Sequence, residues 1–166
     1  MLEPVNLDYV RQMFQNKDNE IWKNNLEKYP KLRTYTKYKH EYKLEPYVFK
    51  IYDRSHRSIM AHFRSGMLPL SLETGRYTNI PEHFRICLFC NSNSIENEVH
   101  FIFECSLYDQ LRQTMLNDVM TKIPDFLLQS IDEKLSILIS ENYVKQTSSF
   151  LYSAFMKRRS ILYNSS

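Results

Sequence analysis

The three cysteines of this 166-residue chain all lie close to one histidine, within residues 87–105. Cys87 and Cys90 are separated by two residues, and His100 and Cys105 by four. Thiolate sulfur and imidazole nitrogen are donors that zinc prefers, and four such donors complete its tetrahedral coordination. Since a catalytic zinc ion keeps one position open for water, a full set of four protein ligands predicts one structural zinc ion.

Two other interpretations of these residues compete with a zinc site. The cysteines could be ordinary buried thiols, with His100 hydrogen-bonded in a core, although three scattered cysteines would rarely fall so close together. A disulfide is the weaker alternative, because the number of cysteines is odd. A C-x2-C redox pair also normally accompanies a thioredoxin-like βαβ pattern, which this sequence lacks. The spacing therefore favours metal binding.

The expected state of the thiols also predicts localisation. Thiols that stay reduced indicate an intracellular protein, either cytoplasmic or nuclear. The first six residues show neither the basic start nor the apolar stretch of a signal peptide, so we expect no leader. No segment approaches about 18 consecutive apolar residues, so we expect no contact with a membrane.

Composition and hydrophobic spacing together indicate the fold class. Hydrophobic residues make up 43% of the chain, which is typical of a globular protein. Only two glycines occur, and a fold rich in tight turns usually needs more. Apolar residues recur at helical spacing. We therefore predict a mostly α fold, a helical domain with an inserted small zinc-clamped module. Its regions are 1–66, 67–122 and 123–166, within one compact unit.

Helical spacing also places the individual elements. Helices are predicted over residues 8–28, 31–43, 46–66, 107–122, 131–140 and 144–163, with residues 67–86 irregular. Thr74 and Gly75 predict a turn with positive φ. His100 and Cys105 would lie about 140° apart on a regular helix, so they cannot share one face of it. A helix should therefore begin at His100 or break near Cys105.

Basic residues are spaced so that they would share one face of the predicted helix over residues 46–66. Lys50, Arg54, Arg57 and Arg64 fall within an arc of about 80° at 100° per residue. Such a row can contact the phosphates of a nucleic acid, and a solvated helix face is the simpler alternative. A second basic cluster, residues 157–159, is expected on the surface of the last helix.

A longer pattern surrounds the four predicted ligands. It comprises residues 57–66, 68–70, 73–77, 85–90, 95–108 and 111–112. Its most specific part is Glu98-Val-His-Phe-Ile-Phe-Glu-Cys-Ser-Leu-Tyr108. This pattern resembles the zinc-binding region at the C-terminal end of reverse transcriptases from non-LTR (LINE-type) retrotransposons. The similarity covers about residues 20–115 and is weak in the C-terminal third. Leu88 and Ser106 stand where many members have proline, but neither position supplies a ligand.

The resemblance implies a domain that binds one zinc ion and contacts RNA or DNA. In this hypothesis Arg76 and Arg85 join the basic row of residues 50–64 in contacting phosphates. The resemblance does not imply polymerase activity, because the chain contains no Asp-Asp pair to hold catalytic metal ions. The sequence also lacks a Walker-type glycine loop and a Gly-x-Ser-x-Gly motif. We therefore expect neither an enzyme nor a small-molecule substrate.

Two further functions remain as alternatives. The chain could be a zinc-stabilised protein-interaction or scaffold module, since its net charge of +3 is modest for a nucleic-acid-binding protein. It could also be a zinc enzyme in which Glu98 or Glu104 acts as the base. The enzyme is least favoured, because four protein ligands leave no position for water.

Overall fold

A computed structural model describes residues 6–26, 28–29 and 32–164 of the chain. Most of these residues are helical, and their one β pairing is an isolated antiparallel bridge between Ile86 and Ile95. The prediction of a mostly α fold is therefore confirmed. None of the described helices has the length and hydropathy that crossing a bilayer requires. The expected absence of a leader concerns the first six residues, of which 1–5 lie outside the described residues.

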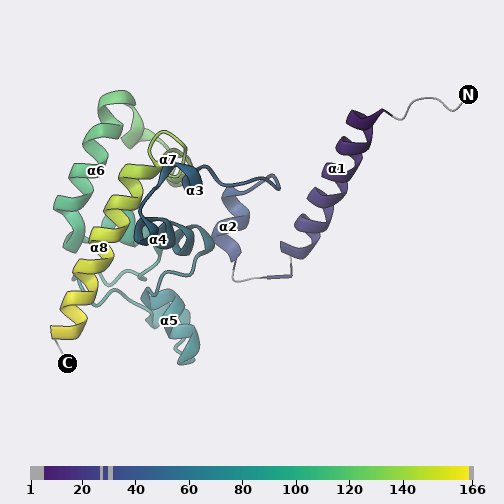
Figure 1. Ribbon diagram of the computed structural model, residues 1–166. Helices are drawn as coiled ribbons and strands as arrows, with labels where there is room; N and C mark the ends of the chain where they lie inside the picture. The colour runs from purple at the N-terminus through teal and green to yellow at the C-terminus, as the bar shows by residue number, and fades with distance from the viewer. Residues whose placement is uncertain (1–5, 27, 30–31, 165–166) are drawn as a thin grey trace, which may run out of the picture.

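Eight α-helices account for most of the described chain (Figure 1). The first five are α1 (Leu7–Leu26), α2 (Arg33–Tyr38), α3 (Pro46–Lys50), α4 (Arg54–Ser65) and α5 (Ser71–Tyr77). The others are α6 (Asp109–Lys122), α7 (Ile131–Leu138) and α8 (Val144–Asn164). Short turns of 3₁₀ helix occupy η2 (Glu82–Phe84), η4 (Ser106–Tyr108) and η5 (Phe126–Leu128), and η3 (His100–Glu104) is a turn of π-helix.

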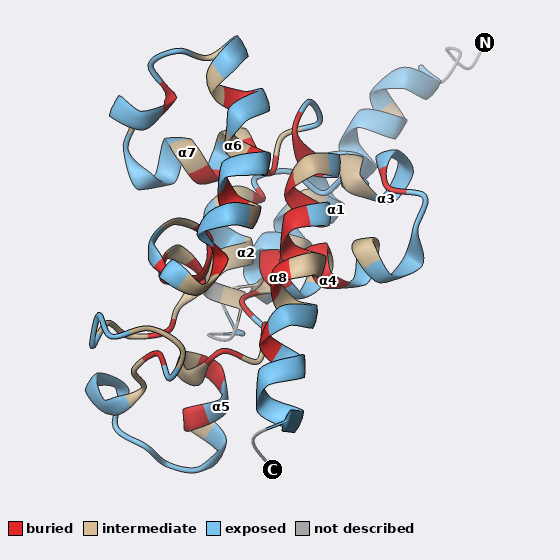
Figure 2. Cartoon of the chain, turned by 90° about the vertical axis from the view of Figure 1, so that its left-hand side faces the viewer, coloured by how far each residue is buried: buried red, intermediate tan, exposed pale blue. Residues whose placement is uncertain are grey.

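The packing of α4 against α8 forms the centre of the molecule (Figure 2). Helix α4 contributes Met60 and Phe63, and α8 contributes Leu151 and Ala154, all of them almost completely buried. The core continues into the predicted metal site through Phe101. Buried residues thus come from each of the three predicted regions.

Helix α1 differs from the other long helices, because none of its 20 residues is buried. It extends away from the packed helices in Figure 1. Its contacts with the rest of the chain include the Trp22 ring, whose centroid lies 6.4 Å from that of Tyr35 and 6.1 Å from that of Tyr42. Residues 27, 30 and 31, near the predicted boundary between the first two helices, lie outside the described residues.

The prediction of a single helix over residues 46–66 is wrong. The chain leaves the helical conformation after Lys50 and re-enters it at Arg54. Asp53 begins the second helix, because its side chain accepts a hydrogen bond of 2.9 Å from the backbone N–H of His56. This capping bond competes with a continuous helix at that position. Lys50 and Arg54 therefore lie on different helices.

The region predicted to be irregular contains α5, and Gly75 lies inside this helix. The predicted positive φ at Gly75 is wrong; among described glycines, Gly66 at the end of α4 has one, of 70°. A Cβ atom at position 75 would lie 2.7 Å from Cγ of Arg85. The glycine therefore allows the Arg85 side chain to pack directly against the helix.

Candidate metal centre

The four predicted ligands converge in the structure. One ligand atom from each of Cys87, Cys90, His100 and Cys105 lies within 4.8 Å of all the others. The Sγ atoms of Cys87 and Cys105 are 3.8 Å apart, and Sγ of Cys90 is 3.3 Å from Nε2 of His100. Two sulfur atoms bound to one tetrahedral zinc ion are about 3.8 Å apart. The cysteines form no disulfide, and these four residues could therefore bind one metal ion.

A short hairpin supplies Cys87 and Cys90. The hairpin is held by the backbone N–H of Cys87, which donates to the carbonyl of Ser94 at 2.9 Å, and by the bridge between residues 86 and 95. Asn93 turns the chain with a φ of 53°. The N–H of Phe89 points back to Sγ of Cys87 at 3.4 Å. The two thiols consequently lie on the same side of one tight turn.

The π-helical turn η3 brings His100 and Cys105 together. The backbone N–H of Cys105 donates to the carbonyl of His100 at 2.8 Å, which is the i→i+5 bond of a π-helix. Residues five apart lie much closer in angle on such a turn than on an α-helix. The chain then becomes extended at Cys105. The prediction that the helix breaks near Cys105 is confirmed, and the π turn explains how both ligands face one point.

Hydrogen bonds from the ring and from the backbone of His100 orient its imidazole. Its Nδ1 lies 3.2 Å from Oε2 of Glu104, which leaves Nε2 facing Cys90. Its backbone N–H donates to Oδ1 of Asn97 at 2.8 Å. A metal-ligating histidine commonly has a carboxylate on its second nitrogen, because this partner fixes the tautomer. From the sequence, Glu104 was a candidate only for a catalytic base, and its orienting contact with His100 was not predicted.

The three thiols lie in environments that shift their pKa values in different directions. Burial raises the pKa of Cys87, and burial also raises the pKa of Cys105 to about 12. Burial raises the pKa of Cys90 too, but hydrogen bonds from Ser92, Cys87 and His100 outweigh it and lower that pKa to about 6. Three crowded thiols cannot all ionise without a compensating positive charge. A divalent metal ion supplies that charge and displaces the remaining protons.

A buried ion pair connects the metal-site hairpin to α8. Glu96, which is 1% exposed, accepts two hydrogen bonds from Arg158, of 3.1 Å to Oε1 and 2.9 Å to Oε2. It also accepts from the backbone N–H and the hydroxyl of Ser71, each at 2.7 Å. The Arg158 guanidinium lies 4.8 Å from the centre of the Phe89 ring. The expectation that Arg158 belongs to a surface cluster is therefore wrong.

A second buried arginine supports the other half of the site. Arg112 donates from Nε to the carbonyl of Ile102 and from Nη2 to the carbonyl of Cys105, both at 2.6 Å. These carbonyls lie at the end of the π turn, where the helical hydrogen bonds stop. Lys157 donates to the carbonyl of Leu107 at 2.8 Å. Side chains of α6 and α8 thus hold the backbone around Cys105.

The arginines predicted to contact phosphates have mostly structural partners. Arg57 donates to the carbonyls of Ile51 and Tyr52, both at 2.8 Å, and so closes the break between α3 and α4. Arg85 donates to the carbonyls of Ile80 and Leu72 at 2.8 Å and 2.9 Å. These contacts use donors that a phosphate would need.

The remaining predicted residues do not form one exposed row either. Arg64 is buried, and its Nη2 lies 2.8 Å from Oε2 of Glu45. Lys50 pairs with Glu141 at 2.7 Å, and Arg76 pairs with Glu73 at 3.2 Å. Arg54 is exposed. The predicted stripe on one helix face is therefore wrong, because the helix is broken and Arg64 faces the interior.

Arg54 lines a groove between α4 and α8, which was not predicted from the sequence. The groove has a volume of about 450 Å³ and is also lined by His62, Tyr152, Phe155 and Arg159. It therefore combines cationic with aromatic side chains. The sequence already predicted that Arg159 lies in an exposed basic cluster. It did not predict that α4 and α8 pack side by side and so bring Arg159 close to Arg54.

The fold and the site together define an all-helical protein with three cysteines and one histidine that could bind one metal ion. Comparisons of the chain with protein-family models, with curated proteins and with solved structures give no match. The resemblance to the reverse-transcriptase region therefore stays a prediction from the sequence.

Proposed function

We propose that this chain is a zinc-stabilised nucleic-acid-binding domain derived from a retrotransposon reverse transcriptase, without polymerase activity of its own. The observation that carries the proposal is the convergence of four ligand atoms within 4.8 Å. Three thiolates and one imidazole are a donor set that structural zinc sites use. The hydrogen bond from His100 to Glu104 supports the same assignment.

Replacing Glu104 tests whether its contact with His100 serves metal binding. We expect Glu104→Gln to weaken zinc binding by about 10- to 100-fold, because the amide orients the imidazole less strongly and adds no negative charge. Competition with a chromophoric chelator measures the affinity. Glu82→Gln, at an exposed position outside the ligand window, is the matched control. Equal zinc affinities of the two variants would show that Glu104 does not orient His100 for metal binding.

The proposed nucleic-acid interface is the groove between α4 and α8. Arginine side chains contact phosphates, and aromatic rings can stack against bases. Arg54 and Arg159 are exposed at this groove, and Tyr152 and Phe155 line it. Together with the resemblance, this combination supports binding of RNA or DNA with little sequence preference.

A salt titration of the double variant Arg54→Gln/Arg159→Gln tests this interface. We expect the variant to bind RNA and duplex DNA more weakly at every sequence, and the slope of log affinity against log salt to fall by about one to two units. Lys17→Gln/Lys23→Gln removes the same charge from exposed positions on α1 and should change binding less. Zinc content should stay unchanged in both variants. No binding near physiological salt by folded, zinc-loaded protein would contradict the proposal.

The scaffold alternative has its own support in α1. This helix exposes Leu7, Met13, Phe14 and Ile21 by more than half, and none of its residues is buried. Several exposed large apolar side chains on one helix are typical of a protein-interaction surface. If the chain is a scaffold, Arg54→Gln/Arg159→Gln should not differ from the original chain in binding RNA or duplex DNA.

A further inference from the structure

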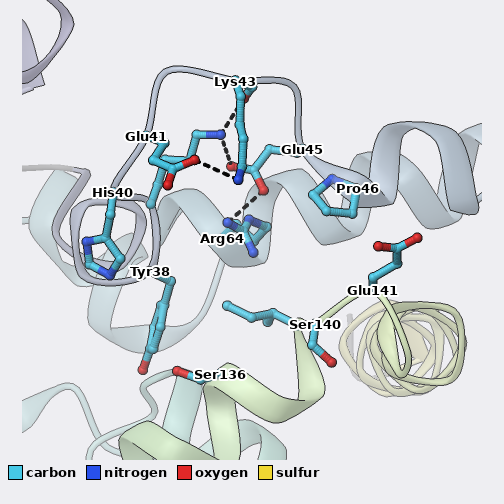
Figure 3. Close-up of a pocket in the computed structure, with 12 residues that line it drawn as sticks. Tyr38, His40, Glu41, Lys43, Glu45, Pro46, Arg64, Ser136, Ser140 and Glu141 are labelled. Carbon is cyan, nitrogen blue, oxygen red and sulfur yellow. Dashed lines mark hydrogen bonds and ion pairs between the residues drawn. The ribbon is translucent and has the colours of Figure 1, made fainter. Parts of the chain in front are cut away.

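A cavity of about 350 Å³ lies where three parts of the chain meet, away from the predicted ligands. Its walls come from the segment between α2 and α3, from the end of α4, and from the region where α7 ends (Figure 3). Lys39 and Arg64 both line it, and only 7% of each side chain is exposed. Buried cations of this kind need partners, because removing a charge from water is unfavourable.

The two cations share one carboxylate. Nζ of Lys39 lies 2.9 Å from Oε1 of Glu45, and Nη2 of Arg64 lies 2.8 Å from Oε2 of the same residue. Lys39 also donates to the carbonyl of Lys43, and Arg64 lies over the Tyr47 ring at 5.9 Å. Neither of these contacts adds negative charge. The buried group of three ionised side chains therefore carries one net positive charge.

The other charged side chains that line the cavity have partners of their own. Lys43 pairs with Glu41 at 2.6 Å, and Glu141 pairs at 2.7 Å with Lys50, which lies outside the cavity lining; all four side chains are exposed. These pairs leave the buried positive charge uncompensated. Among the described residues, moreover, Nε of Arg64 has no hydrogen-bond partner although it is buried. A buried donor without an acceptor is unfavourable, because the hydrogen bond to water that it gave up is not replaced.

We infer that this cavity binds a phosphate group, with Arg64 and Lys39 as the charged donors. A phosphate supplies the missing negative charge and accepts from the unused donor. Tyr38 and Ser136 line another wall of the cavity (Figure 3), and the Tyr38 hydroxyl already donates to Oδ1 of Asp132 at 3.5 Å. The volume suits a small ligand. The inference is independent of the proposed function, because it involves neither the metal ligands nor the groove.

Titration of the full zinc-loaded chain with inorganic phosphate tests the inference, with chloride at matched ionic strength as reference. In amide proton–nitrogen spectra we expect saturable shifts in residues 39–45, 64 and 136–141. A 5′-phosphorylated oligonucleotide and its 5′-hydroxyl counterpart then identify the source of the phosphate. Competition by the phosphorylated form alone indicates a nucleic-acid end, and competition by neither indicates free phosphate. Absence of saturable shifts beyond those of chloride would overturn the inference.

Two variants separate a binding site from a purely structural ion group. Glu45→Gln removes the internal competitor for both cations, so we expect it to bind phosphate about tenfold more tightly. Arg64→Lys should bind at least about tenfold more weakly, because it loses the planar donor fork. Glu20→Gln, at an exposed position on α1, should leave the affinity unchanged. If Glu45→Gln folds and binds phosphate no more tightly, the inference is wrong; if it does not fold, the titration of the unaltered chain decides.

Discussion

Removal of the metal should unfold the segment around the four ligands and destabilise the chain by an amount on the order of 10 kcal/mol. Metal binding stabilises a module of this kind directly, because the ligands come together only in the folded chain. Without the ion, the pKa values of Cys87 and Cys105 lie above that of an ordinary thiol, and these thiols hold protons in place of metal. Hydrogen exchange over residues 85–108 and thermal unfolding, each with and without a chelator, measure the effect.

Substitutions give the same test without a chelator. Cys87→Ser and His100→Ala each remove one donor, so both should lose the metal and most of the protection of residues 85–108. Ser106→Ala changes an exposed side chain next to a ligand and should keep the metal. Melting temperatures that are equal with and without chelator would contradict a stabilising metal.

The second large effect is expected at the buried ion pair between Glu96 and Arg158. We predict that Arg158→Met lowers the free energy of unfolding by about 3–5 kcal/mol, because Glu96 is left as an uncompensated buried charge. Denaturant unfolding of the zinc-loaded protein measures the loss. The exposed pair of Arg11 and Asp8 is the control, and Arg11→Met should change the stability by less than about 1 kcal/mol.

A double variant shows whether the lost charge balance is the cause. Glu96→Gln/Arg158→Met removes both charges and keeps an oxygen that can accept from Ser71. It should therefore be more stable than Arg158→Met alone. If the double variant is the less stable of the two, the destabilisation comes from lost packing of Arg158 against Phe89 rather than from the buried charge.

The convergence of the four candidate ligands was predictable from the sequence because its signal is local. The spacing of Cys87 and Cys90, and that of His100 and Cys105, already identified the four residues that converge. Most helices were predictable for the same reason, since their apolar residues recur at short range. The π turn was not predicted, but the conflict between its five-residue spacing and a regular helix indicated that something other than an α-helix was needed.

The charged residues show why the rest could not be predicted. Helical spacing locates the face on which an arginine lies, but it does not reveal what covers that face. Arg64 and Arg158 both looked like surface residues, and the partner of Arg158 lies 62 positions away along the chain. Charged side chains are rarely buried without a partner, so a buried one cannot be recognised until its partner is known. The groove between α4 and α8 depends on the same long-range packing.

The break before Arg54 had a local signal that the helical pattern obscured. Aspartate is among the residues most favoured at the start of a helix, and Asp53 takes that position. The apolar residues on both sides of it continue at helical spacing, which is why one long helix was predicted.

The zinc content of the purified protein tests the central proposal most directly. Protein prepared under reducing conditions and without chelator should contain one zinc ion per chain by elemental analysis, and Cys87→Ser protein should contain almost none. Folded protein without zinc, after preparation in its presence, would contradict the account.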